Sequence, residues 1–430
     1  MRARLLIALV LNLGAVPAFG AELTRVASSF EPDHPFGFFL DASYERTQTR
    51  GLITREWYDE GRLKDVAELR YTRIESALNI DAHLGLYRDL ELHFALPVIF
   101  QDDESWGFAG TNSDATTTLY RNCLAPDGSL SPTCPGPGLG SDRLFNVDES
   151  ARAYRGGLGD ITFGLGWAAF NEKKDPTKAT WALRFDYTAP TAAVRNPSVA
   201  TSASARGALG DGAHRFTLSS AFSKRFAFAE PYTKIHYTLP FNSGRAYANC
   251  DNPDATRMAA PGNCGSPHWS RAETALTPAH RGGGLVGMEV IPWDNPEKGH
   301  RFAVDLQGAV TYVSAGRYAN EMSAMLGKLL TTGDYLQVGG QVGLVGHFAG
   351  IFHLKVYAGL SHNTEHTLTD ELVGKDLDAA GTEGAGKIDV MPGSREVTPS
   401  YDWRIDRVGR RFRVAETTVF RFAIQATLTF

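Results

Sequence analysis

A His-Asn-Thr-Glu-His pattern at His362, Glu365 and His366 is the strongest sign of chemistry in the sequence. Its spacing matches one class of metallopeptidase, in which a helix places both histidines on one zinc ion and the glutamate acts as base. Here the pattern follows an alternating, strand-like segment and enters a loop. A surface metal site is an alternative to catalysis, but the sequence favours neither.

Other catalytic patterns are incomplete or absent. The segment Gly381-x4-Gly386-Lys387 resembles a phosphate loop, but Ile388 replaces the required Ser or Thr. The glycine-rich run that ends at Asp160 lacks the helix that a nucleotide fingerprint requires, and no GxSxG motif occurs. The sequence therefore predicts no catalytic residue, no metal and no cofactor, and we do not expect an enzyme.

The four cysteines form two local pairs, each in a stretch rich in Pro and Gly. Cys123 lies close to Cys134, and Cys250 lies close to Cys264. Four cysteines allow three pairings, and two local disulfides are the simplest in an oxidising compartment. A metal site would require CxxC-like spacing or nearby histidines, and neither pair has them.

The N-terminal segment has the features of an export signal. Residues 1–20 contain two arginines and no acid, then the apolar stretch Leu5–Leu13, and Ala18-Phe19-Gly20 supplies small residues for cleavage. This predicts a bacterial secretory signal peptide over 1–20; a buried N-terminal helix is the alternative. The remaining chain has 41 basic and 48 acidic side chains, which argues against a nucleic-acid partner.

Alternation of apolar and polar residues with a period of two predicts strands along the whole chain. It is clearest between Phe420 and Phe430, and a terminal aromatic residue in that register resembles the C-terminal signature of bacterial outer-membrane barrels. The resemblance implies recognition of Phe430 by the barrel assembly machinery. Twelve strands are predicted: near 36–48, 74–86, 90–100, 161–169, 181–187, two within 212–241, and near 281–293, 302–312, 336–348, 352–360 and 420–430.

The connections alternate between short and long. Long connections are predicted at 49–65, 102–156, 190–211, 241–280, 316–333 and 364–413. An even strand count with short turns at one end and long loops at the other is typical of an outer-membrane barrel. We therefore expect residues 21–430 to form one all-β antiparallel barrel of about twelve strands in the outer membrane of a Gram-negative bacterium, with both termini in the periplasm. A periplasmic β-sandwich or propeller is the alternative.

The polar faces of these strands carry charges of both signs, which we place inside the barrel. The predicted lumen-lining residues are Arg73, Glu75, Asp81, His83, Glu91, His93, Arg184, Asp186, Arg215, Lys234, Glu289, Arg301, Asp305, Lys355 and Arg421. Two interpretations stay open: a hydrated passage, or a lumen closed by salt bridges across it. Residues 317–330 have helical apolar spacing, which predicts a helix that serves as a lid or packs on the rim.

One stretch resembles a known family. The motifs are Gly85–Leu92 with Leu96-Pro97, Gly157–Leu165, Pro190-Thr191, Gly210-Asp211-Gly212, Ser223-Lys224 and Pro231-Tyr232. They resemble a family of outer-membrane channels associated by name with the meta-cleavage pathway of phenol degradation. The resemblance implies passive or gated passage of small, often aromatic or hydrophobic molecules, with outer-membrane lipid and the solute as partners. A non-conducting barrel that displays loops for adhesion or partner binding is the main alternative, and an outer-membrane hydrolase is the third.

Overall fold

The computed structural model describes residues 21–31, 35–59, 61–120, 143–148, 151–254, 257–258, 260–265, 267–377, 387–390 and 393–430. The predicted signal peptide and the predicted Cys123–Cys134 pair lie outside these residues, so both stay predictions. Among the described residues, no helix is long and apolar enough to cross a membrane.

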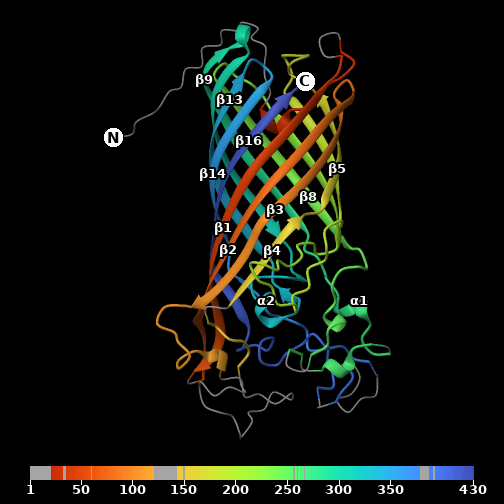
Figure 1. Ribbon diagram of the computed structural model, residues 1–430, viewed down its shortest axis with the longest axis vertical. Helices are drawn as coiled ribbons and strands as arrows, with labels where there is room; N and C mark the ends of the chain where they lie inside the picture. Colours follow the sequence, from red (N-terminus) through yellow and green to blue (C-terminus); the bar gives the residue numbers. More distant parts are fainter. Residues whose placement is uncertain are drawn as a thin grey trace.

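Twelve antiparallel strands form a closed barrel, which confirms the predicted fold class (Figure 1). Each strand pairs with the next along the barrel, and the last pairs with the first, so that Phe39 lies opposite Thr429. The barrel strands are β1 (Phe38–Asp59), β2 (Arg62–Tyr87), β3 (Leu90–Phe108), β5 (Ile161–Phe170), β6 (Thr180–Ala189), β7 (Ala213–Ser223), β8 (Ala229–Asn242), β9 (Arg281–Asn295), β10 (His300–Val313), β13 (Tyr335–Phe348), β14 (Phe352–Asn363) and β16 (Phe412–Thr429).

Short turns join the strands at the end where the C-terminus lies, and long loops lie at the other end (Figure 1). In the turn between β13 and β14, Ala349 and Gly350 both have positive φ, 52° and 72°. That combination defines the type I′ hairpin turn, whose twist matches the twist of the strands. By the usual arrangement of such barrels, the short turns mark the periplasmic end.

The barrel wall is taller on one side than predicted. Residues 49–59 and 62–65 belong to a long β1–β2 hairpin, so the predicted long loop at 49–65 is wrong. Between Leu52 and Ile53 the pairing of β1 with β16 shifts by one residue, because β16 has an extra residue there. β1 itself keeps its alternation, so Ile53 faces inward as Asp41 does, and it is fully buried. The inner face is therefore apolar at this height, where the polar-inside pattern ends.

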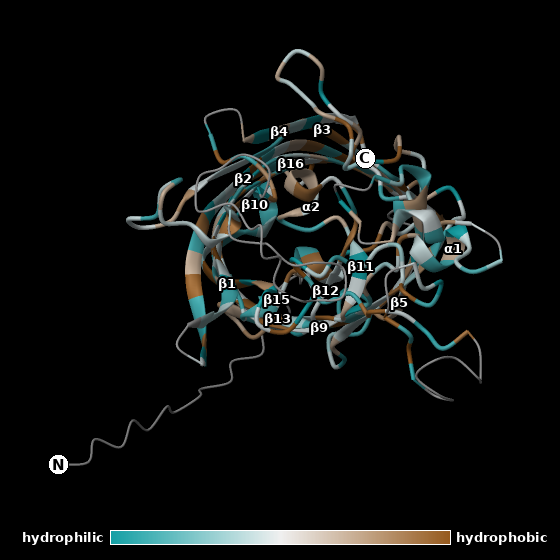
Figure 2. Ribbon diagram, turned by 90° about the horizontal axis from the view of Figure 1, so that it is seen from below, coloured by the Kyte–Doolittle hydropathy of each residue, from teal (hydrophilic) through white to brown (hydrophobic). Residues whose placement is uncertain are grey.

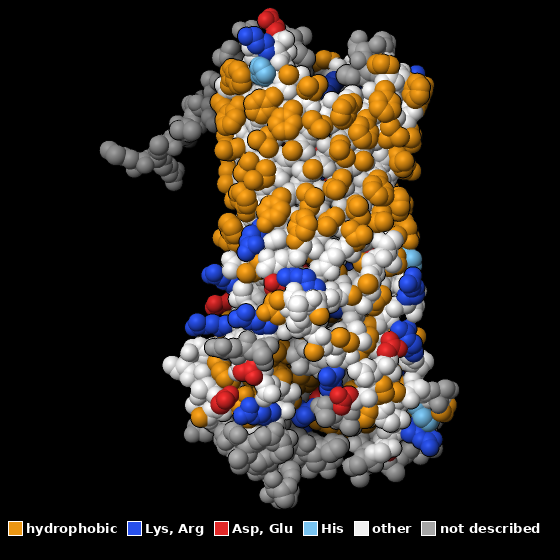
Figure 3. Space-filling model, viewed as in Figure 1, with side chains coloured by type: hydrophobic (Ala, Val, Ile, Leu, Met, Phe, Trp, Pro, Cys, Tyr) orange, Lys and Arg blue, Asp and Glu red, His pale blue; other side chains and the backbone are white. Residues whose placement is uncertain are grey.

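An apolar belt covers the face of the barrel seen in Figure 3, next to the short turns, and charged side chains begin below it. Its exposed members come from nearly every strand: Leu92, Phe94, Phe163, Leu165, Trp167, Phe185, Leu218, Ile235, Val286, Trp293, Phe302, Leu306, Val310, Leu336, Val338, Val342, Leu344, Leu360, Phe420, Ile424 and Leu428. A closed barrel has no unpaired edge, and this belt gives it an apolar surface for lipid. The protein is an outer-membrane β-barrel.

Short elements from the long loops fill the extracellular end. These are β4 (Arg152–Leu158), β11 (Gly316–Tyr318), β12 (Leu330–Thr332), β15 (His366–Thr367), α1 (Arg271–Thr274), α2 (Ser323–Leu326), and the 3-10 turns η2 (Thr118–Tyr120), η4 (Asn249–Asp251) and η5 (Pro261–Asn263). Along the barrel axis, β11, β12 and α2 lie inside the ring of strands (Figure 2). At the other end of the barrel lie η1 (Glu22–Thr24) and η6 (Pro296–Lys298).

The helix predicted over 317–330 is wrong in extent, because only one helical turn forms. Gly327 ends it in the left-handed conformation, at φ 67°. The apolar residues of this segment pack into an extracellular cap, which we define as the loop segments around a buried cluster. That cluster comprises Ile53, Leu69, Tyr71, Trp106, Leu119, Tyr120, Ala151, Ala153, Met322, Leu326, Leu330, Leu368, Ile405, Phe412 and Val414.

The predicted Cys250–Cys264 disulfide is present, with the two Cα atoms 5.5 Å apart. The disulfide links η4 to the residue that follows η5 in the long loop between β8 and β9.

Candidate functional site

The lumen contains two cavities at different heights, and no lining residue is shared between them. The inner cavity, of about 400 Å³, lies toward the periplasmic end, and the outer cavity, of about 470 Å³, lies under the extracellular cap. The predicted lumen residues that line the inner cavity are Asp81, His83, His93, Arg184, Asp186, Lys234, Glu289, Asp305 and Lys355. Arg73 and Arg215 line the outer one.

A chain of ion pairs follows β2, β3 and β6 beside the inner cavity. The His83 ring nitrogen lies 3.2 Å from the Glu91 carboxylate, which Arg184 also reaches at 3.1 Å. His93 lies 3.3 Å from the carboxylates of both Asp81 and Asp186. These contacts bring together six of the residues that the sequence predicted, all on neighbouring or next-neighbouring strands.

A second group lies on β8, β9 and β10. Arg301 approaches Glu289 at 2.5 Å and Glu230 at 3.5 Å, and all three side chains are almost completely buried. The neighbouring Asp305 accepts hydrogen bonds from Lys355, at 2.9 Å, and from Tyr232. The sequence analysis missed Glu230 and Tyr232, although Glu230 alternates with apolar neighbours at the start of β8 and could have been counted.

The other predicted lumen residues also pair locally. Arg73 lies 2.6 Å from Asp102 and 2.8 Å from Glu75. Arg215 pairs with Asp211, and Arg421 lies 3.1 Å from Glu45. The arginines therefore pair with acids along the wall of the lumen, within one strand, between adjacent or next-neighbouring strands, or with the segment beside them. The two cavities lie inside this wall.

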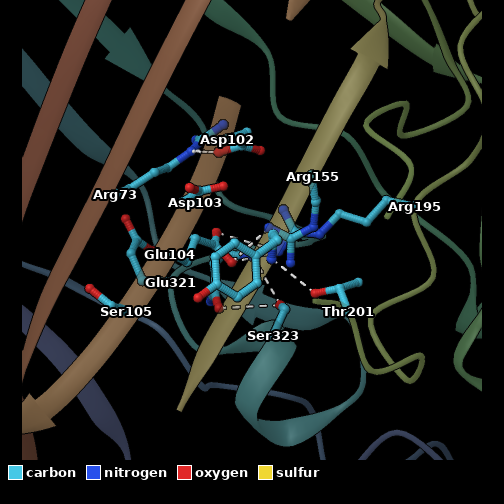
Figure 4. A network of polar contacts seen from close by, with 12 residues as sticks. Arg73, Asp102, Asp103, Glu104, Ser105, Arg155, Arg195, Thr201, Glu321 and Ser323 are labelled. Carbon is cyan, nitrogen blue, oxygen red and sulfur yellow. Dashed lines mark hydrogen bonds and ion pairs between the residues drawn. The ribbon is translucent and has the colours of Figure 1, made fainter. Parts of the chain in front are cut away.

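A polar network fixes the wall of the outer cavity (Figure 4). The Glu104 carboxylate on β3 accepts a hydrogen bond from Arg155 on β4 at 2.8 Å and from the Tyr71 hydroxyl at 3.2 Å. Arg195, from the loop between β6 and β7, reaches the same carboxylate at 3.3 Å. The network ties β4 and this loop to the barrel. Sequence reasoning missed it because all three charged residues lie within or beside segments assigned to long loops.

The N-terminal segment 21–31 lies inside the periplasmic end and lines the inner cavity through Ala21, Glu22, Leu23 and Arg25. Backbone and side-chain hydrogen bonds hold it: Ala27 donates to the Glu91 carboxylate at 2.7 Å, and the Ser28 hydroxyl donates to Asp89 at 2.6 Å. The Arg184 guanidinium donates to the Arg25 carbonyl at 2.7 Å. We call residues 21–31 the N-terminal plug. No periodic pattern in residues 21–31 predicts this segment.

In the metallopeptidase-like pattern, His366 and Glu365 have separate partners. His366 stacks on Tyr335, with ring centroids 4.2 Å apart, and its Nδ1 lies 2.8 Å from the Thr364 carbonyl. Glu365 forms an ion pair with Arg413 at 2.9 Å. These contacts give the pattern a structural role at the end of β14 and in β15.

Among the described residues, one group of three could bring metal-ligand atoms together: Glu22, His347 and His353, within 4.8 Å of one another. The two rings are parallel, with centroids 4.0 Å apart and an interplanar angle of 1°. Lone pairs of imidazole nitrogens lie in the ring plane, so stacked rings cannot both aim at an ion at about 2.0–2.1 Å. Arg25 also lies 2.6 Å from the His353 Nδ1. This arrangement does not suit a metal.

Asp406 in the extracellular cap gives the cap a pH dependence. Burial raises its pKa to about 7, and Glu371 and Asp402 add to this effect, whereas Lys328 at 4.0 Å opposes it. The folded cap therefore favours the protonated acid. Below its unfolded pKa of 3.8, Asp406 does not lower the free energy of unfolding of the cap. Between pH 4 and 7 it lowers this free energy increasingly, by about 4 kcal/mol at most.

We expect segment 398–411 to open more readily at pH 8 than at pH 5, and Asp406→Asn to remove most of that difference. Native-state hydrogen exchange of this segment, corrected for the intrinsic effect of pH, measures it. The neighbouring Asp402, whose pKa is lowered, contributes only at more acidic pH. Full pH dependence in Asp406→Asn would assign the effect to another group.

Comparison with known proteins finds similar folds. No protein-family model matches the chain, and no curated protein matches it. The solved COG4313 outer membrane channel from Pseudomonas putida F1 is 13% identical, with 92% of this chain and 96% of that chain covered and a TM-score of 0.42. A Pseudomonas aeruginosa FadL homologue is 10% identical, with 91% and 90% covered and a TM-score of 0.33. The outer membrane protease OmpT from Escherichia coli is 8% identical, with 95% and 100% covered and a TM-score of 0.29.

Proposed function

We propose that this protein is a gated outer-membrane channel that passes small molecules through the barrel lumen, without catalysis. The observation that carries the proposal is the arrangement of the lumen charges. Arg73, Arg184 and Arg301 each pair with an acid, but on the same side of the barrel, so their ion pairs line the wall and leave the two cavities between them. A barrel of about twelve strands is wide enough for such a space.

The alternative is a non-conducting barrel that displays its loops. In that case the lumen would be filled from the wall, because buried charges are stable only when matched and hydrogen-bonded. Here the charged side chains of the wall pair with neighbours on the wall. Two separate segments, the N-terminal plug and the extracellular cap, close the lumen. Segments that fill a lumen from its ends can move without breaking the barrel, which favours a gated path over an anchor.

The outer cavity suits small aromatic solutes that also carry polar or charged groups. Its lining combines three tyrosines, Tyr71, Tyr318 and Tyr335, with charged side chains such as Arg195 and Arg281. Aromatic rings pack on one another with a gain beyond their buried area, and tyrosine hydroxyls add polar contacts. We infer that a small aromatic solute would rest in this cavity on its way to the inner one.

Filling the outer cavity tests the proposal. Ala279, which lines it, is changed to tryptophan, and solute entry is followed by swelling of proteoliposomes with a panel of small aromatic and aliphatic acids and sugars. We expect Ala279→Trp to slow entry severalfold, because a tryptophan side chain occupies much of the cavity.

The matched control is Ala358→Trp on β14, opposite the belt residue Val342 and therefore on the lipid-facing side. It should leave entry unchanged, and heat-modifiable gel migration shows whether both variants fold. Proteoliposomes that stay impermeable to every solute both with the wild-type protein and after deletion of residues 21–30, with each barrel folded, would contradict the channel and support the loop-displaying anchor.

A further inference from the structure

Two buried carboxylates share one arginine near the periplasmic end of the lumen. Glu230 on β8 is fully buried, Glu289 on β9 is 2% exposed, and Arg301 on β10 is 2% exposed. Arg301 lies 2.5 Å from Glu289 and 3.5 Å from Glu230, so its pairing with Glu289 is the closer one. Glu230 therefore forms the longer and weaker of the two ion pairs with Arg301. Buried charges that are incompletely matched are costly.

The backbone nitrogen of Ala21 donates a hydrogen bond to the Glu230 carboxylate. Ala21 is fully buried, and the residues after it are held in place. The Thr24 hydroxyl lies 2.8 Å from the Ser223 hydroxyl, and the plug continues to its contacts with β3. The position of this nitrogen is therefore set by the plug as a whole. It is also the atom that a cut after Gly20, the predicted cleavage site, would release as an amine.

We propose that Glu230 is the binding site of the α-ammonium group that signal-peptide cleavage creates on Ala21. Hydrolysis of the Gly20–Ala21 bond consumes one water molecule. Its hydroxyl goes to the Gly20 carbonyl carbon, and its hydrogen goes to the Ala21 nitrogen. At neutral pH the new carboxyl loses a proton and the amine gains one, which gives a carboxylate and an ammonium.

The ammonium adds a cation that contacts Glu230 directly. Two carboxylates then face two cations, Arg301 and the Ala21 ammonium. The other charges nearby have their own partners: Glu172 pairs with Lys224 at 3.0 Å, and Asp305 pairs with Lys355 at 2.9 Å. Lys173, on the turn between β5 and β6, also attracts Glu230, but Arg301 and Arg25 repel Lys173.

Processing would therefore change how firmly the plug is held. Before cleavage, the Ala21 nitrogen is a neutral amide with one hydrogen; afterwards it is a cation with three. Hydrogen bonds between ionised groups are about twice as strong as those between neutral groups. The plug would dock fully only in the processed protein, whether or not the lumen conducts, so this inference stands or falls independently of the channel.

The test measures the reactivity of the Ala21 amine in the folded, processed barrel. Intact mass first establishes that the protein purified from outer membranes begins at Ala21. An acylating reagent is then applied at pH 7, and the modified N-terminal peptide is quantified in the folded and the urea-unfolded protein. A rise of one unit in the pKa of the amine lowers its reactivity about tenfold at fixed pH, and burial adds to this. We expect at least that difference between the two states.

Two variants assign the protection to Glu230. Glu230→Gln should restore reactivity at least severalfold, whereas the control Glu297→Gln, in the exposed η6 turn, should react like wild type. If Glu230→Gln does not fold, one glycine inserted after Gly20, with cleavage before it, moves the amine away from Glu230 and should expose it equally. A chain that begins at another residue, an amine that reacts equally fast when folded, or variants as protected as wild type would each overturn the proposal.

Discussion

Deletion of residues 21–30 should turn a barrel with little or no conductance into one with discrete, frequent conductance steps. This segment occupies the periplasmic half of the lumen and lines the inner cavity. A twelve-stranded barrel lies between about 8 strands, whose interior side chains fill, and about 16, whose lumen is open, so removing a lumen segment should raise conductance on the order of tenfold. Single-channel recording in planar bilayers measures it.

The control replaces residues 21–30 with a Gly/Ser segment of the same length. This keeps the chain in place but removes the hydrogen bonds of Thr24 and Ser28 and the contact of Arg25 with His353. If these contacts hold the plug, the replacement should conduct in irregular bursts between wild type and deletion. Equal, low conductance in all three proteins, with each barrel folded, would place the main resistance in the extracellular cap and contradict closure by the plug.

The membrane-spanning part of the fold could be predicted from the sequence because lipid imposes a single rule. Every strand that crosses the belt must put apolar side chains outside, and residues such as Phe420 and Leu344 follow that rule. Above the membrane the rule no longer applies. Ile53 on β1 still faces inward but is apolar because it packs against the cap, and a pattern of polar inward residues taken from the membrane segment predicted a loop where the hairpin continues.

The two closing segments could not be predicted for different reasons. The apolar spacing of Met322 and Leu326 was real, but it serves packing into the cap, and Gly327 ends the helix after one turn. The N-terminal plug has almost no repeating pattern. Its position depends on hydrogen bonds to single residues on distant strands, such as Glu91 and Ser223, and no local spacing encodes them.

All inward-facing charged residues were predicted to line the lumen in the same way, but the structure shows some of them buried and others exposed. Arg301 and Arg421 both project from the inner face of the wall and both pair with glutamates. Their side chains differ in exposure, 1% against 48%. Sequence alternation predicts whether a side chain faces the lumen but not how exposed it is to water, because its exposure depends on what else occupies the lumen. We expect this difference in exposure to decide how much each arginine contributes to the free energy of unfolding.

Arg301→Met should therefore lower the free energy of unfolding of the barrel by about 3–5 kcal/mol, because Glu230 and Glu289 lose their shared cation in a buried site. Arg421→Met removes an ion pair of 3.1 Å in a hydrated setting, and should cost no more than about 1 kcal/mol. Urea unfolding of the two variants in the same detergent or lipid measures both, with the temperature of the heat-modifiable gel shift as a second readout.

Combining Arg301→Met with Glu289→Gln should recover part of the loss, since one of the two stranded carboxylates becomes neutral. Equal destabilisation by Arg301→Met and Arg421→Met would mean that water reaches Glu230 and Glu289 in solution. In that case the periplasmic end of the lumen would be open, and the N-terminal plug could not be the element that closes it.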